Sequence, residues 1–147
     1  MIFLTFACSA DKVDSASTIQ QEAQVDPLEW DFWEDGPYRV GYIKWDFTIT
    51  NPAGNERTIP MNLWYPTTDD DGDDVYYFGF PDPLSFGDAE PTAPVYTGGF
   101  PVFVYSHGSY GYGGTSPFLS RHFASHGWLV IAPDHLGNTI ADYGDDV

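Results

Sequence analysis

Residues 100–134 read FPVFVYSHGSYGYGGTSPFLSRHFASHGWLVIAPD and carry the strongest pattern in the chain. Residues 100–106 and 128–134 are short apolar runs rich in β-branched and aromatic side chains. Runs of this kind, without polar alternation, are typical of strands that are buried on both faces of a parallel sheet. The stretch therefore predicts two parallel strands, and the segment between them has to make the crossover.

The segment between the two runs carries the signals of one helix. Ser116 favours an N-cap, Pro117 suits the first helical position, and Gly127 favours a left-handed residue after the helix ends. One side of this helix carries the apolar residues Phe118, Leu119, Phe123 and Ala124. Strand, helix and strand in this order predict a right-handed crossover and an α/β fold class.

Two alternating segments precede this unit. Residues 42–50 alternate between apolar and polar side chains, which is typical of a half-buried strand. The apolar side chains that point one way are those of Ile43, Trp45, Phe47 and Ile49. A turn at residues 51–55 separates them from a second alternating run at residues 59–65. The two runs predict an antiparallel hairpin at the start of the sheet.

An acidic insert at residues 67–99 interrupts the pattern with prolines, aspartates and aromatic side chains. It is predicted to be a long surface excursion. The run DDDGDD at residues 69–74 raises the alternative of a loosely bound calcium ion. When Gly72 is placed at the sixth position of a calcium-binding loop, the twelfth position is Phe78 instead of Glu. A solvated acidic loop is the simpler interpretation, and no metal site is predicted.

Composition and the N-terminal residues bear on location and partners. The 147 residues allow one domain, and a formal net charge of −17 with only five Lys and Arg argues against binding to nucleic acid or to anionic membranes. Residues 1–10 resemble a partial lipoprotein signal in which Cys8, the only cysteine, is the lipidation site. Residues 11–35 read as a flexible tether. We therefore expect a bacterial protein that is secreted, or a periplasmic or outer-membrane lipoprotein with a lipid anchor on Cys8.

The glycine-rich loop and the helix partly match the motifs of three kinds of site, and each match has a departure. The loop at residues 108–114 does not match a dinucleotide fingerprint, because the last glycine position falls on Ser116, so no cofactor is predicted. His122 and His126 have the spacing of a zinc hydrolase, but Phe123 stands where such enzymes have Glu. Ser109 lies in HGSYG, which differs from the nucleophile motif G-x-S-x-G at its first position.

Five short motifs, in this order and spacing, resemble the α/β-hydrolase superfamily. Within the superfamily, the sequence resembles the branch that holds platelet-activating-factor-acetylhydrolase-like and dienelactone-hydrolase-like proteins, with bacterial cutinases and polyester hydrolases as relatives. The motifs are GPYRVG (36–41), LWYP (63–66), VYSHG (104–108), ASHG (124–127) and DHLGNT (134–139). The resemblance covers residues 36–140 apart from the insert. It implies that residues 36–147 are a truncated hydrolase domain, which would be a three-layer sandwich if complete.

The resemblance also implies a function and a set of roles. The residue after His-Gly, here Ser109, would donate its backbone N–H to the oxyanion hole of a serine carboxylic-ester hydrolase. Tyr110 and Tyr112 would line a substrate pocket, and His107 would be structural. The substrate would be a small-molecule or lipid ester. The triad follows later in this fold, and the sequence contains no G-x-S-x-G, so the chain alone is expected to be inactive.

Two further expectations follow from this interpretation. Residues 100–106 would lie beside the strand that leads to the nucleophile, so without that strand they become an exposed edge, and the chain alone is expected to be poorly soluble or partly unfolded. The alternative function is a non-catalytic extracellular domain that binds calcium weakly.

Overall fold

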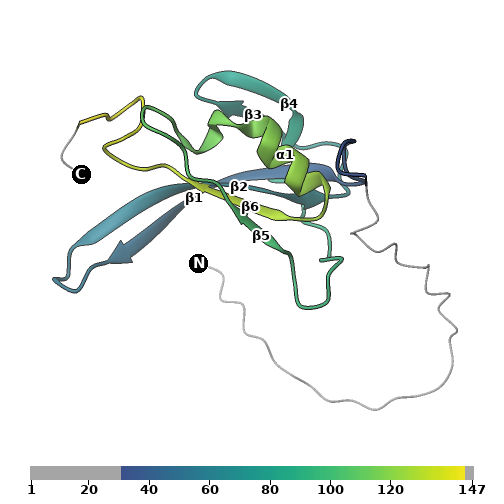
Figure 1. The fold of residues 1–147 in the computed structure, drawn as a ribbon, viewed down its shortest axis with the longest axis horizontal. Helices are drawn as coiled ribbons and strands as arrows, with labels where there is room; N and C mark the ends of the chain where they lie inside the picture. Colours follow the sequence, from purple (N-terminus) through teal and green to yellow (C-terminus); the bar gives the residue numbers. More distant parts are fainter. Residues whose placement is uncertain (1–30, 145–147) are drawn as a thin grey trace, which may run out of the picture.

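A six-stranded mixed sheet with one α-helix on one of its faces makes up the structure (Figure 1). The structure is a computed structural model that describes residues 31–144. The strands lie in the order β3-β4-β1-β2-β6-β5. Their bounds are β1 (Arg39–Thr50), β2 (Glu56–Thr67), β3 (Asp73–Tyr77), β4 (Phe80–Gly87), β5 (Val102–Val104) and β6 (Leu129–Pro133). The 3-10 helix η2 (Gly113–Thr115) and the helix α1 (Pro117–Ser125) lie between β5 and β6.

The predicted lipidation site at Cys8 and most of the predicted tether lie outside the described residues. At the end of the tether, Phe32 stacks on the ring of His126, with ring centroids 4.6 Å apart. Among residues 31–144, no helix has the length and apolar character needed to cross a membrane.

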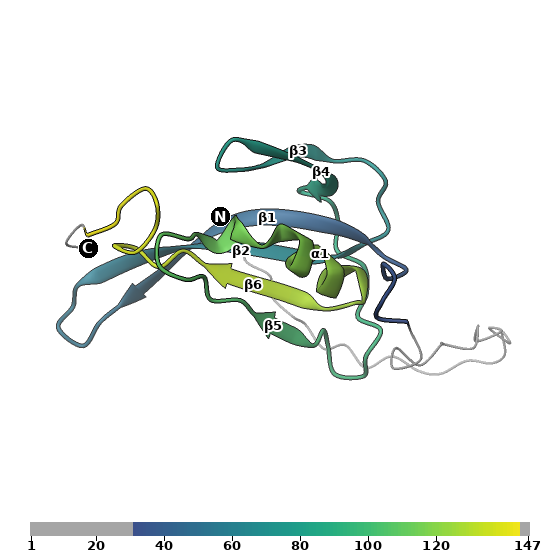
Figure 2. The ribbon, with the colours of Figure 1, turned by 45° about the horizontal axis from the view of Figure 1, so that its top comes forward.

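The two alternating segments form β1 and β2, which pair antiparallel along their whole lengths. The side chain of Asn51 closes the turn between them, because its Oδ1 accepts hydrogen bonds from the backbone N–H groups of Ala53 and Asn55 at 3.0 Å. The tip of this hairpin extends beyond the rest of the sheet (Figures 1 and 2). On its other side, β2 pairs antiparallel with β6.

The β5-α1-β6 unit occupies the stretch that predicted it. Strand β5 pairs parallel with β6, and α1 begins at Pro117. Gly127 follows the helix with φ +84°, the left-handed conformation that glycine adopts readily. The Ser116 side chain does not cap the helix, contrary to the prediction. Its Oγ lies 2.9 Å from the Tyr105 hydroxyl, and this hydrogen bond takes the place of the cap.

The acidic insert is not a surface excursion over residues 73–87, so that prediction was wrong. Strands β3 and β4 form an antiparallel hairpin, and β4 joins β1 as a parallel neighbour. Val75 and Tyr77 alternate with Asp74 and Tyr76 and point into the core, where they are 4% and 5% exposed. The many acidic side chains on the solvent side hid this alternation in the sequence.

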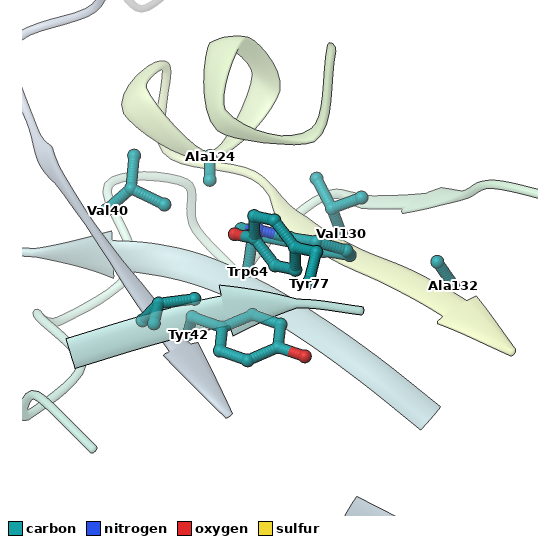
Figure 3. Packing of buried hydrophobic residues seen from close by; sticks show 8 residues of the cluster. Val40, Tyr42, Trp64, Tyr77, Ala124, Val130 and Ala132 are labelled. Atoms are coloured by element: carbon teal, nitrogen blue, oxygen red, sulfur yellow. The ribbon is translucent and has the colours of Figure 1, made fainter. Parts of the chain in front are cut away.

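Trp64, which is fully buried, lies at the centre of the core between the sheet and α1 (Figure 3). Its Nε1–H donates to the Tyr77 hydroxyl at 2.7 Å, and the Tyr77 hydroxyl donates to Asp82 Oδ2 at 2.8 Å. Asp82 also forms an ion pair with Arg121 of α1 at 2.8 Å. These contacts link the hairpin β3–β4 to the helix. Each polar atom in them has a partner, so their burial leaves no unpaired group among them.

One face of α1 packs closely on the sheet. Its buried residues are Ser120, Ala124 and Ser125, and Ala124 is fully buried against the core. Phe118, which the sequence placed on the apolar side of the helix, is 67% exposed. The helix therefore approaches the strands through small side chains, and a large aromatic ring is left in solvent.

The opposite face of the sheet is apolar and is uncovered along much of β1. The prediction that residues 42–50 form a half-buried strand placed Ile43, Trp45, Phe47 and Ile49 on the buried side, but their exposed fractions are 39%, 52%, 40% and 40%. Within residues 31–144 α1 lies on the other face, and this face is covered at Tyr65, which is 8% exposed and whose hydroxyl donates to the Ala89 carbonyl at 2.7 Å. The third layer of a hydrolase sandwich is thus not among the described elements.

Strand β5 ends the sheet, as the sequence led us to expect, and Val102 and Val104 are 50% and 63% exposed on it. We expect the isolated chain to self-associate through this edge and the adjoining apolar face. Val104→Lys places a charge on the edge and should shift the chain toward monomer in sedimentation velocity. Ile140→Lys, at a residue with 52% exposure outside the sheet, should not. A wild-type chain that sediments as a monomer and unfolds cooperatively would contradict this expectation.

Candidate functional site

The loops that follow β5 and β6 meet at one edge of the sheet, because the two strands are parallel and their carboxyl ends lie side by side. The backbone N–H of Tyr110 donates to the Asn138 carbonyl at 3.1 Å, and the Ser109 hydroxyl donates to Asn138 Oδ1 at 3.1 Å. A single parallel bridge joins Gly111 to Thr139. The glycine-rich loop is therefore held on one side by the loop at residues 134–139.

His107 is buried and has a partner at each ring nitrogen. Its Nδ1–H donates to the Gly108 carbonyl at 2.8 Å, and its Nε2 accepts the backbone N–H of His135 at 2.9 Å. This pattern assigns a neutral ring with the proton on Nδ1. Both nitrogens form hydrogen bonds with backbone groups, so His107 joins the two loops and neither nitrogen is left for acid–base chemistry.

The backbone N–H of Ser109 has a different setting from those of its neighbours. The next two amides in the chain, of Tyr110 and Gly111, both donate to backbone carbonyls. Ser109 is exposed, and among the described residues its own N–H donates to no protein acceptor. The loop thus presents one unused donor at the carboxyl edge of the sheet, while the amides beside it hold the backbone in place.

The structure separates the two tyrosines that the sequence placed together. Tyr110 adopts φ +63° and stacks on Tyr143, with ring centroids 4.0 Å apart. Tyr112 turns toward the hairpin β3–β4 and packs on Phe78, with ring centroids 5.4 Å apart. It lines a cavity of about 330 Å³ together with Phe80 and other residues of β4 and α1. Burial, followed by the charge of Asp134, raises the pKa of the Tyr112 hydroxyl.

Asp134 anchors the glycine-rich loop to the sheet, a role that the sequence did not reveal. Its Oδ1 accepts the backbone N–H of Gly113 at 2.6 Å and the side-chain amide of Asn62 at 3.1 Å. The Tyr42 hydroxyl donates to Asn62 Oδ1 at 2.8 Å and extends this network into the core. An aspartate directly after an apolar strand was the available signal.

Ser106 and His135 form a second contact that sequence reasoning missed. The Ser106 Oγ lies 2.7 Å from His135 Nε2, and the His135 ring lies against His107 with centroids 4.5 Å apart. The distance is that of a nucleophile and its base. Among the described residues, however, no carboxylate hydrogen-bonds to His135. The pair has no third group to orient the imidazole, and it ties the two loops together.

Neither the zinc spacing on the helix nor the acidic run at residues 69–74 gains support from the geometry. The rings of His122 and His126 do lie near each other, with centroids 4.6 Å apart, but the Nδ1 of His126 contacts the His122 carbonyl at 2.8 Å. In the part of the chain that the structure describes, no three His, Cys, Asp or Glu side chains are grouped to hold a metal ion. That part includes the acidic run.

Gly113 and Gly108 give a test of how tightly this loop is held. A Cβ on Gly113 would lie 2.2 Å from Asn62 Nδ2 and 2.5 Å from the Ala132 carbonyl oxygen, whereas a Cβ on Gly108 would meet nothing within 4 Å. We expect Gly113→Ala to lower the free energy of unfolding by about 1–3 kcal/mol, as overpacking typically does. Gly108→Ala should leave it nearly unchanged. Equal urea midpoints for the two variants would show that the loop is not packed on the sheet in this way.

Comparison with known proteins identifies the fold. No protein-family model matches the sequence, and no curated protein matches it. Among solved structures, the chain is similar to a ferulic acid esterase from Streptomyces cinnamoneus, with a TM-score of 0.51 and 19% sequence identity. The similarity covers 70% of this chain and 34% of the esterase chain, so this chain spans about a third of the length of that structure. The likeness confirms the predicted α/β class as a shared fold.

Proposed function

We propose that this chain is the N-terminal part of a serine carboxylic-ester hydrolase, in which the backbone N–H of Ser109 is one donor of the oxyanion hole. The unused N–H of Ser109, on a loop held by its neighbouring amides, is the observation that carries the proposal. Ester hydrolysis places negative charge on the carbonyl oxygen, and a donor that is already fixed needs no reorganisation when that charge develops. The shared fold with part of an esterase supports the same interpretation.

The proposal assigns supporting roles to the residues around this donor. His107 and Asp134 hold the loop through backbone N–H groups, so they position the donor without contacting the substrate. The cavity beside Tyr112 and Phe80 would take part of the acyl group, and Tyr110 does not line it. The nucleophile, the acid and the base would come from residues beyond this sequence, because it contains no G-x-S-x-G.

The finer parts of the proposal rest on the sequence. The motif order points to the platelet-activating-factor-acetylhydrolase-like and dienelactone-hydrolase-like branch, and hence to a small-molecule or lipid ester as substrate. The partial lipoprotein signal with Cys8 supports a secreted bacterial protein with a lipid anchor.

Reading the coding sequence downstream of Val147 tests the proposal. We expect an in-frame G-x-S-x-G, followed by an Asp or Glu and then a His that complete the triad in this order. A stop codon directly after Val147, together with a chain that is soluble and monomeric, would contradict it and favour a non-catalytic domain.

A further inference from the structure

A separate cavity of about 720 Å³ lies between α1, β4 and the start of β1. None of the residues that line it belongs to the loops that follow β5 and β6. Its volume is in the range of small-molecule sites, which is about 300–1,000 Å³. Two of these elements supply its apolar wall. Leu84 and Phe86 come from β4, and Phe118 and Leu119 come from α1.

Much of this wall is in contact with water. Leu84 is 63% exposed and Phe118 is 67% exposed, and Trp33, at 95% exposure, also lines the cavity. Exposed apolar side chains that are scattered singly need no explanation, but a group of them around one hollow is typical of an interaction site. A ligand that reaches this cavity gains by removing apolar area from water on both sides.

The lining of the same cavity also contains basic side chains. The sequence has only five Lys and Arg against 22 Asp and Glu, and two of the five, Arg39 and Arg121, line the cavity together with His122. Arg121 is neutralised by its ion pair with Asp82 at 2.8 Å. Asp35 also lines the cavity, and among residues 31–144 it is the one acidic residue that does so.

Arg39 is the cation available to a ligand. Its Cζ lies 5.7 Å from the centroid of the Phe86 ring, so the guanidinium sits against the apolar wall. Among the described residues, no carboxylate forms an ion pair with it. A planar guanidinium in this position can bind both oxygens of a carboxylate.

We propose that this cavity binds a carboxylate with an apolar body, such as a medium-chain fatty acid. The carboxylate lies on Arg39, and the apolar body lies between β4 and α1. This ligand chemistry uses the two properties that the cavity combines, whereas a cationic amphiphile would meet Arg39 with the same sign of charge. The proposal does not depend on ester hydrolysis.

Isothermal titration of the 147-residue chain carrying Val104→Lys with decanoate, below its micelle concentration, tests the proposal. We expect saturable binding of one decanoate per chain, with weaker binding of decanol and of decyltrimethylammonium. Arg39→Gln should weaken decanoate binding about tenfold or more, because a hydrogen-bonded charge is lost. Arg57→Gln is the matched control, since Arg57 lies on β2 and does not line the cavity. Circular dichroism verifies that both variants keep the fold.

Three results would overturn the proposal. They are the absence of saturable decanoate binding, equal affinity for decanoate and decyltrimethylammonium, and equal losses in the two arginine variants. Sedimentation equilibrium on the same samples shows whether a second copy of the chain occupies the cavity instead of a ligand. A dimer that dissociates on Arg39→Gln and does not respond to decanoate would assign the cavity to a second copy of the chain.

Discussion

Replacing the backbone amide of residue 109 with an ester is expected to lower kcat by about 100- to 1,000-fold, the cost of removing one oxyanion donor. The measurement needs a protein in which this chain is joined to the remainder of the proposed hydrolase domain. The ester keeps the Ser109 side chain and removes only the N–H that the structure leaves unused. KM should change little, because the donor acts mainly on charge that develops in the transition state.

Two matched variants separate this effect from damage to the loop. Ser109→Ala keeps the N–H and removes the hydroxyl that bonds to Asn138, so kcat should be nearly unchanged. The same backbone ester at Tyr110 removes the hydrogen bond to the Asn138 carbonyl and should lower stability more than kcat. If Ser109→Ala is as harmful as the ester at residue 109, the role belongs to the side chain and the oxyanion assignment is wrong.

Trp64→Ala is expected to destabilise the fold by about 3–5 kcal/mol, as removal of a buried tryptophan usually does. Trp64 is fully buried in the core and donates its Nε1–H to the Tyr77 hydroxyl, so the substitution removes packing and a buried hydrogen bond together. The free energy of unfolding of a small domain is about 5–15 kcal/mol in total, so the variant should unfold at low urea or lack a folded baseline.

Trp45→Ala is the matched control for this prediction. Trp45 is 52% exposed on the uncovered face of the sheet, where it contacts Phe47 with ring centroids 5.6 Å apart. Its loss should cost about 1 kcal/mol or less. Both variants are best compared in the Val104→Lys background by urea unfolding. Similar losses of unfolding free energy at the two positions would show that the core does not lie on the α1 face of the sheet.

The sequence identified the central unit because its signals are local. The apolar runs, Pro117 and Gly127 each fix a boundary within a few residues, and β5, α1 and β6 lie where these signals placed them. The hairpin β3–β4 was missed because Val75 and Tyr77 alternate within a strongly acidic segment. Its place beside β1 is a long-range pairing that local composition does not encode.

The candidate site was predictable only in part. A short motif located Ser109 on a loop, but the state of its N–H depends on where the neighbouring amides find acceptors, and Asn138 lies far along the chain. The same holds for Asp134 and Gly113, and for Ser106 and His135, which the sheet brings together. The exposure of Trp45 and its neighbours was not foreseen because alternation shows that one face is apolar and not what covers it.

Labelling with a serine-reactive phosphonate, together with turnover of p-nitrophenyl acetate, tests the central claim most directly. The 147-residue chain and the proposed longer protein are measured side by side. We predict no labelling and no turnover for the chain alone, and labelling of the longer protein on a serine outside residues 1–147. A probe found on Ser109 or Ser106, with turnover lost when that serine is replaced by alanine, would contradict the account and place the nucleophile within this chain.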